Sequence, residues 1–216
     1  NKLFFSIAFL KRLNYIIWYK HRVLSFPTSD NDIVFFSHYI PERTTNPLSA
    51  PFYDNQFLCL DILKATNRDV FYKEHPVSLK LSNSHRNATY HDQCYIKNLL
   101  ASDVLFFDNK SKGEVKYVVA TMNGTAGLEY ALNGHKVVCF GSAWYSFLPN
   151  VHLYENHTML LRFLESDDDI PSSEIRNILI NGIKRFTVDA RVDDKYSSGA
   201  KLNIQSLIYV FNNCID

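Results

Sequence analysis

The stretch TMNGTAGLEYALNGHKVVCFGSAWY, residues 121–145, decides the fold of this chain. It starts at the end of an apolar segment, turns at Asn123, Gly124 and Thr125, and continues with helical spacing to about residue 133. A second apolar segment follows at residues 136–140 and ends at Gly141. A strand, a glycine turn, a helix and a further strand in this order predict a unit with two parallel strands.

The segments around this unit continue the same alternation. Further strands are expected at residues 33–38, 69–73, 104–107 and 117–121, and further helices at 55–66, 91–101, 156–165, 172–184 and 201–213. The pattern predicts an α/β fold, a Rossmann-like parallel sheet with flanking helices. Residues 108–116 leave little room for a crossover helix, so we expect either an edge strand at 104–107 or a reduced crossover.

The size and charge of the chain narrow the possible classes of protein. A length of 216 residues suits one large domain, and a net charge of +1 gives no general basis for binding nucleic acid. We predict a basic amphipathic helical segment and linker at residues 1–31, followed by one Rossmann-like domain at residues 32–216. Because the sequence opens with Asn1 instead of Met, we expect a fragment of a longer protein.

The first 26 residues contain five Lys or Arg and no acidic residue, and their apolar run is too short to span a bilayer. We expect this segment either to pack on a protein domain or to contact anionic lipid headgroups. The four cysteines lack CxxC spacing, which favours buried thiols in a reducing compartment. The predicted location is therefore cytoplasmic, with peripheral contact on the inner face of the plasma membrane. No metal-ligand cluster is recognised, and no metal or other cofactor is expected.

The turn at residues 121–125 is the first candidate site. Free backbone NH groups at the start of a helix attract anions, Gly124 permits close approach, and the hydroxyls of Thr121 and Thr125 can donate hydrogen bonds. Asn123 or Thr125 could instead be only an N-cap. One helical turn further on, Glu129 could accept hydrogen bonds from a ribose, or be only an exposed helix residue.

Two further loops follow strands and carry polar side chains. Lys73, Glu74 and His75 follow one strand, and Pro76 holds His75 in an extended loop where it could bind a phosphate or be merely structural. His38 and Glu42 follow another strand: His38 could shuttle a proton, and Glu42 could act as a general base or orient a sugar hydroxyl. The alternative for this second loop is a polar connection without a ligand.

In their order along the chain, these loops resemble the bacterial capsule polysaccharide biosynthesis family of Kdo-transferase-like, GT-B-type glycosyltransferases. The matching motifs are HYxPE with a Thr-rich loop at 38–45, KEHP at 73–76, GTAGLE at 124–129, the GKPV-like segment at 134–138 and GxAxY at 141–145. The chain departs from the family's pattern at His135 and Lys136, and in its short 108–116 connection.

The resemblance implies a metal-independent glycosyltransferase that moves a sugar from a nucleotide-sugar donor, such as CMP-Kdo, to a glycan or glycolipid acceptor of a surface polysaccharide. It implies that His75 and the 121–125 turn contact the nucleotide phosphates, that Glu129 contacts the ribose, and that Glu42 is the catalytic or acceptor-facing carboxylate. Lys73 belongs with the nucleotide-binding residues. The alternatives are a nucleotide-sugar epimerase of the same architecture and a non-catalytic binding or assembly module.

Overall fold

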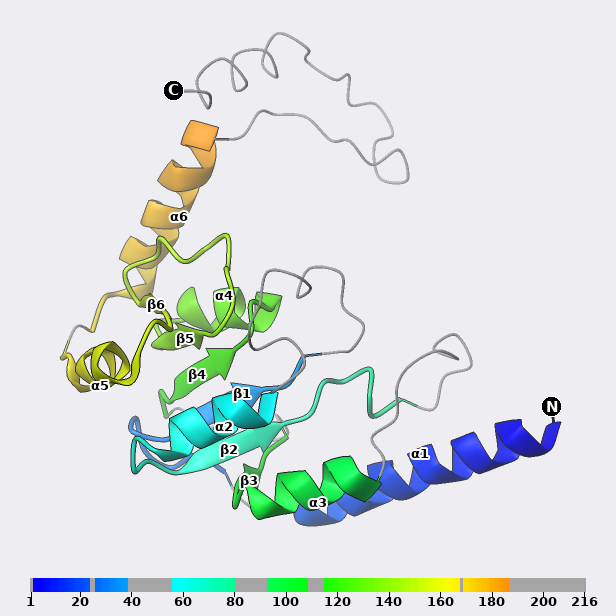
Figure 1. Ribbon diagram of the computed structural model, residues 1–216. Helices are drawn as coiled ribbons and strands as arrows, with labels where there is room; N and C mark the ends of the chain where they lie inside the picture. Colours follow the sequence, from blue (N-terminus) through cyan, green and yellow to red (C-terminus); the bar gives the residue numbers. More distant parts are fainter. Residues whose placement is uncertain are drawn as a thin grey trace, which may run out of the picture.

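A six-stranded parallel sheet forms the centre of the protein in the computed structural model, which describes residues 2–23, 26–38, 56–80, 93–108, 115–167 and 169–186. In the described residues its strands lie in the order β3-β2-β1-β4-β5-β6 (Figure 1). Their bounds are β1 (Ile33–Phe36), β2 (Val70–Lys73), β3 (Leu105–Phe106), β4 (Val118–Thr121), β5 (Val137–Cys139) and β6 (Val151–Leu153).

This strand order confirms the predicted Rossmann-like α/β fold. The chain builds outward from β1 to β3 on one side, then returns to β4 beside β1 and builds outward to β6 on the other side. All residues of β1, β4 and β5 are buried, as expected for strands covered on both faces. The point between β1 and β4 where the order reverses is the place where open α/β sheets usually bind ligands.

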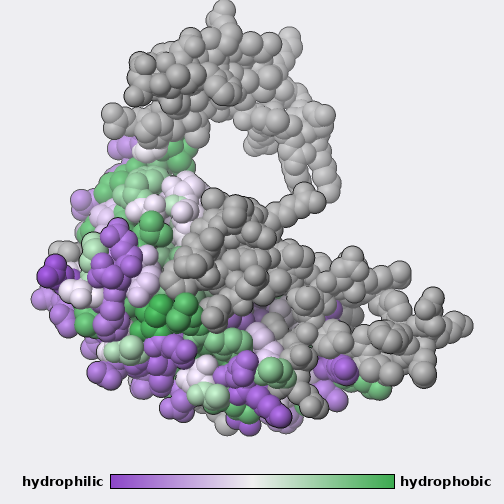
Figure 2. Space-filling model, in the orientation of Figure 1, coloured by the Kyte–Doolittle hydropathy of each residue, from purple (hydrophilic) through white to green (hydrophobic). Residues whose placement is uncertain are grey.

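Helices cover both faces of the sheet. Buried residues of α1 (Lys2–Arg22), α2 (Gln56–Lys64), α3 (Gln93–Ala101) and α5 (His157–Glu165) join one hydrophobic cluster with the strands. Buried residues of α4 (Thr125–Ala131) and α6 (Ser172–Phe186) join the cluster on the opposite face. Among the coloured residues of Figure 2, hydrophilic ones cover much of the surface, and apolar ones gather between α5 and α2 and along α6.

Most of the predicted elements are present, with boundaries that differ by a few residues. The strand after residue 103 is β3 at the edge of the sheet, as one of the two interpretations of the short connection expected. Strand β6 was not predicted, because its three residues, Val-His-Leu, are too few to give a pattern. The predicted helix at 201–213 and residues 109–114 of the short connection lie outside the described residues.

The second half of α1 packs on the sheet. Tyr15, Ile16 and Tyr19 are buried, and the Trp18 and Tyr19 rings contact the Phe106 ring edge-on at centroid distances of 5.4 and 5.8 Å. This part of the basic helix therefore packs on the chain's own domain. Within the described part of the chain, no helix has both the length and the apolar character needed to cross a membrane.

Candidate functional site

The candidate site lies at the carboxyl ends of β1, β2 and β4. Parallel pairing sets Phe36 beside both Lys73 and Thr121, so the loops that follow these three strands leave the same edge of the sheet. His38, the Lys73–His75 segment and the turn after Thr121 are therefore brought together at the reversal of strand order. The structure thus collects on one edge the described residues that the sequence singled out in three separate loops.

The turn before α4 is held by Tyr145. Gly124 is the N-cap of α4 and has extended backbone. The Tyr145 hydroxyl donates to the Gly124 carbonyl at 2.6 Å. At Gly127, a side chain would place its Cβ 2.3 Å from the Tyr145 hydroxyl oxygen, so only glycine lets Tyr145 reach this position. The N-cap position therefore belongs to Gly124, and the prediction of Asn123 or Thr125 as the N-cap residue is wrong.

The side chains of the turn differ in exposure. Thr121 is only 3% exposed and lies beneath the helix, with its Cγ2 3.0 Å from the Cβ position of Gly127. Asn123 and Gly124 are half-buried, and Thr125 is exposed. Thr125 is therefore exposed at the start of α4, whereas Thr121 supports the turn from within.

Lys73, at the end of β2, interacts with residues of β1, of α4 and of the segment after β3. Its ammonium lies over the Phe36 ring, 4.6 Å from the ring centroid. Burial lowers the pKa of Lys73 from its ordinary 10.5, while the carboxylates of Asp108 after β3 and Glu129 on α4 act in the opposite direction. The predicted site residues Lys73 and Glu129 are thus close enough to interact electrostatically. Asp108 is a further nearby carboxylate, which the sequence analysis did not single out.

Glu74 is a buried carboxylate, 2% exposed, beneath the loop that carries His75. The hydroxyls of Tyr15 and Tyr72 both donate to Oε2, the latter at 3.0 Å, and Ser37 Oγ donates to Oε1 at 3.0 Å. Burial, together with the Glu74 charge, raises the pKa of both tyrosines, which keeps their hydroxyls protonated as donors.

This network holds the backbone of His75. The His75 amide donates both to Ser37 Oγ and to Glu74 Oε1, each at 2.8 Å. The His75 side chain is half-buried, and its Nδ1 accepts a hydrogen bond from the Val77 amide at 3.2 Å. In the neutral ring this bond assigns the proton to Nε2. Glu74 thus fixes the loop, a role that its sequence motif alone did not show.

The third predicted loop is only partly described. His38 follows β1 and is buried. Glu42 lies outside the described residues, so its role as a catalytic carboxylate stays a prediction.

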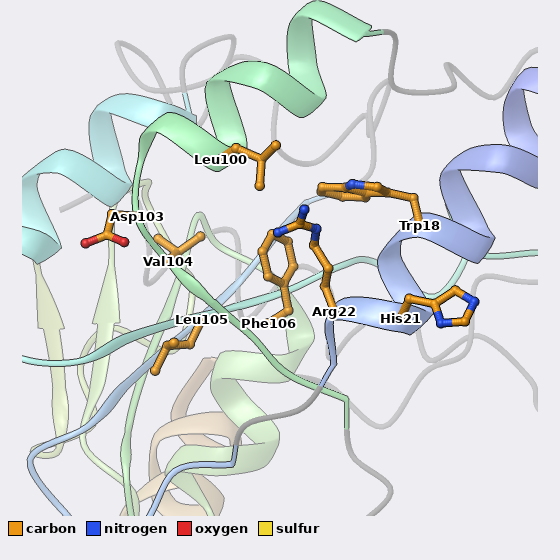
Figure 3. A pocket seen from close by; sticks show the side chains of 8 residues that line it. All are labelled: Trp18, His21, Arg22, Leu100, Asp103, Val104, Leu105 and Phe106. Atoms are coloured by element: carbon orange, nitrogen blue, oxygen red, sulfur yellow. The ribbon is translucent and has the colours of Figure 1, made fainter.

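A separate cavity of about 720 Å³ lies at the β3 edge of the sheet, between α1 and α3. Figure 3 shows Trp18, Arg22 and Phe106 among the side chains that line it; the Arg22 guanidinium carbon is 5.2 Å from the Trp18 ring centroid. The other residues that line the cavity are His21, Leu100, Asp103, Val104 and Leu105. None of the predicted site residues lines this cavity.

Two other sequence-based expectations concern cysteines and metals. Cys59 and Cys139 are buried free thiols, and burial raises the pKa of Cys139 to about 11, whereas Cys94 is exposed. Cys214 lies outside the described residues. Among the residues that the structure describes, no group of three or more His, Cys, Asp or Glu side chains could hold a metal ion.

The strand order and the polar groups at its switch point define a Rossmann-like α/β protein. No family model matches this sequence, and no curated protein matches it. Among solved structures, the chain is similar to KpsC of Thermosulfurimonas dismutans, described as a beta Kdo 2,7 transferase, with 14% sequence identity and a TM-score of 0.48. The match covers 97% of this chain and 63% of that structure, so the chain spans less than two thirds of its length. The fold follows from the chain's own strand order.

Proposed function

We propose that this chain is the nucleotide-sugar-binding part of a glycosyltransferase that builds a capsular or other surface polysaccharide. The observation that carries the proposal is the convergence of Lys73, His75 and the Gly124–Thr125 turn at the reversal of strand order. Open α/β sheets bind nucleotides at this position. The order of the sequence motifs along the chain, which resembles capsule biosynthesis glycosyltransferases, supports the choice of reaction.

In this proposal the phosphates of the donor lie near the turn before α4. The backbone NH groups of the Gly124–Thr125 turn, the Thr125 hydroxyl and the His75 Nε2–H supply hydrogen-bond donors, and the Lys73 ammonium supplies positive charge. Glu129 accepts hydrogen bonds from the ribose hydroxyls. Thr121 and Asn123 complete the nucleotide-binding set, with buried Thr121 supporting the turn.

The donor that we propose is CMP-Kdo or a similar nucleotide-linked sugar, and the acceptor is a glycan or glycolipid. Glu42 and His38 are the proposed catalytic residues, with Glu42 as general base or acceptor-facing carboxylate and His38 as proton shuttle. The reaction requires no metal in this scheme. Donor turnover with an acceptor would separate a transferase from the epimerase alternative, which would convert the donor without any acceptor, and from a non-catalytic module, which would do neither.

Calorimetric titration of the purified chain with CMP, UDP and GDP tests the nucleotide-binding part of this proposal. We expect at least one nucleotide to bind. His75→Ala and Glu129→Ala should each weaken binding by at least about tenfold, because the first loses a hydrogen bond to the charged phosphate and the second loses the carboxylate that accepts from the ribose. Glu165→Ala is the matched control, because Glu165 is exposed at the end of α5, away from these loops. A folded wild-type chain that binds none of the three nucleotides would refute the proposal.

Peripheral contact with an anionic membrane is a further part of the proposal. Exposed Phe9, Leu10 and Ile17 on α1 lie among the cations Lys11 and Lys20. Apolar side chains with basic neighbours suit the headgroup region of anionic lipids. The chain should co-sediment at low salt with vesicles that contain anionic lipid and not with neutral ones. Failure to co-sediment with the anionic vesicles would refute the proposed membrane contact.

A further inference from the structure

Trp144 is an exposed aromatic residue on a well-anchored loop. The loop follows β5, and the side chain of Trp144 is 60% exposed, whereas its neighbours Ala143 and Tyr145 are buried. A turn closes around it, in which the Ser146 amide donates to the Ala143 carbonyl at 3.0 Å. Because buried residues flank Trp144 on both sides, its indole is presented to solvent from a fixed backbone.

The same loop is attached to the candidate site. The Gly141 amide donates to the Met122 carbonyl at 2.8 Å, and the Tyr145 hydroxyl donates to the Gly124 carbonyl at 2.6 Å. The Trp144 and Tyr145 rings meet edge-on at a centroid distance of 5.8 Å. Trp144 is therefore separated from the turn before α4 by about one tyrosine side chain and one ring contact, a separation on the scale of a single nucleotide.

We propose that Trp144 is the aromatic platform on which the base of the bound nucleotide stacks. The inference rests on the proposed nucleotide site and adds the group that receives the base. A rigid, exposed indole loses little conformational freedom on binding, and every nucleobase offers a flat face to it. Stacking of this kind contributes affinity without selecting one base, so Trp144 acts on cytosine, uracil and guanine alike.

The two tryptophans of the chain, Trp18 and Trp144, allow a direct test. In Trp18→Phe, Trp144 is the only source of indole fluorescence, and we expect nucleotide binding to quench it. In the matched variant Trp144→Phe, the remaining Trp18 lies in the separate cavity at the β3 edge, so its emission should not change. Ribose 5-phosphate, which lacks a base, should leave the emission of both variants unchanged.

Calorimetry on Trp144→Ala supplies the affinity. Loss of one base stack should weaken nucleotide binding about 5- to 150-fold, with a smaller loss in Trp144→Phe, and should leave binding of ribose 5-phosphate as in wild type. Two results together would refute the platform while the nucleotide site stands: Trp144→Ala binds the nucleotide as tightly as wild type, and the nucleotide leaves the Trp144 emission of Trp18→Phe unchanged. If the folded wild type binds no nucleotide, both proposals fail.

Discussion

Replacement of Gly127 by alanine tests how the turn before α4 is built. The added Cβ would lie 2.3 Å from the Tyr145 hydroxyl oxygen and 3.0 Å from Thr121 Cγ2, and both side chains are buried. Tyr145 must therefore move and lose its hydrogen bond to the Gly124 carbonyl.

The expected loss of stability combines three contributions. Overpacking costs about 1–3 kcal/mol, and the lost hydrogen bond costs about 0.5–1.5 kcal/mol. The better helix propensity of alanine returns about 0.5–1 kcal/mol. The net loss in the free energy of unfolding is about 0.5–4 kcal/mol, or roughly 1–16 °C in Tm for a chain of this size.

Urea denaturation of Gly127→Ala, Tyr145→Phe and the double variant measures this effect. Because Tyr145→Phe removes the oxygen that clashes, Gly127→Ala should cost at least about 0.5 kcal/mol less in that background. Gly124→Ala is the matched control: its Cβ would lie 3.3 Å from the nearest atom, Thr121 Oγ1, so it should cost less than about 1 kcal/mol. A Gly127→Ala protein as stable as wild type would refute the proposed packing.

Three further predictions concern stability. Gly134→Ala should lower the free energy of unfolding by about 1–2 kcal/mol in urea denaturation, because Gly134 has a φ of +86° that other residues rarely adopt; an unchanged midpoint would contradict this. Glu74→Gln should lower it by about 1–3 kcal/mol, since a neutral amide is a poorer acceptor for the buried hydroxyl donors; Glu165→Gln, its exposed control, should change it by less than about 0.5 kcal/mol. Burial lowers the pKa of His135 below its ordinary 6.5, so the unfolded chain takes up a proton at higher pH than the folded chain, and stability should fall as the pH drops below about 6.5. Between pH 7 and pH 5 the Tm of His135→Phe should fall less than the Tm of wild type. An equal fall in both proteins would refute this role of His135.

The sequence predicted the architecture, and the sheet edge that the candidate residues share, for physical reasons that act locally. Apolar runs such as residues 33–36 and 118–121 are buried on both faces and leave a clear signal of parallel strands. Parallel strands direct all their carboxyl ends to one edge, so the polar residues after β1, β2 and β4 had to share that edge. This is why separate motifs could predict that Lys73 and Glu129, on the helix that follows β4, lie near each other, as their electrostatic interaction shows.

The contacts within the site could not be predicted in the same way. The hydroxyl that Tyr15 brings to Glu74 comes from α1, which lies 59 residues earlier in the chain, and no local pattern links the two. The role of Tyr145 in holding the Gly124 turn depends on the packing of one loop on a helix start. Such contacts follow from tertiary packing, whereas strand ends and turns follow from sequence periodicity and residue type.

The most direct test of the central claim is an amide chemical-shift titration of the ¹⁵N-labelled chain with the nucleotide that binds most tightly in calorimetry. The proposed site predicts the largest shifts at His75, Gly124 and Thr125, where the loops after β2 and β4 meet. Shifts confined to Trp18 and Arg22 would place the ligand in the separate cavity at the β3 edge and contradict the proposed site. The absence of any shift at saturating nucleotide would contradict nucleotide binding itself.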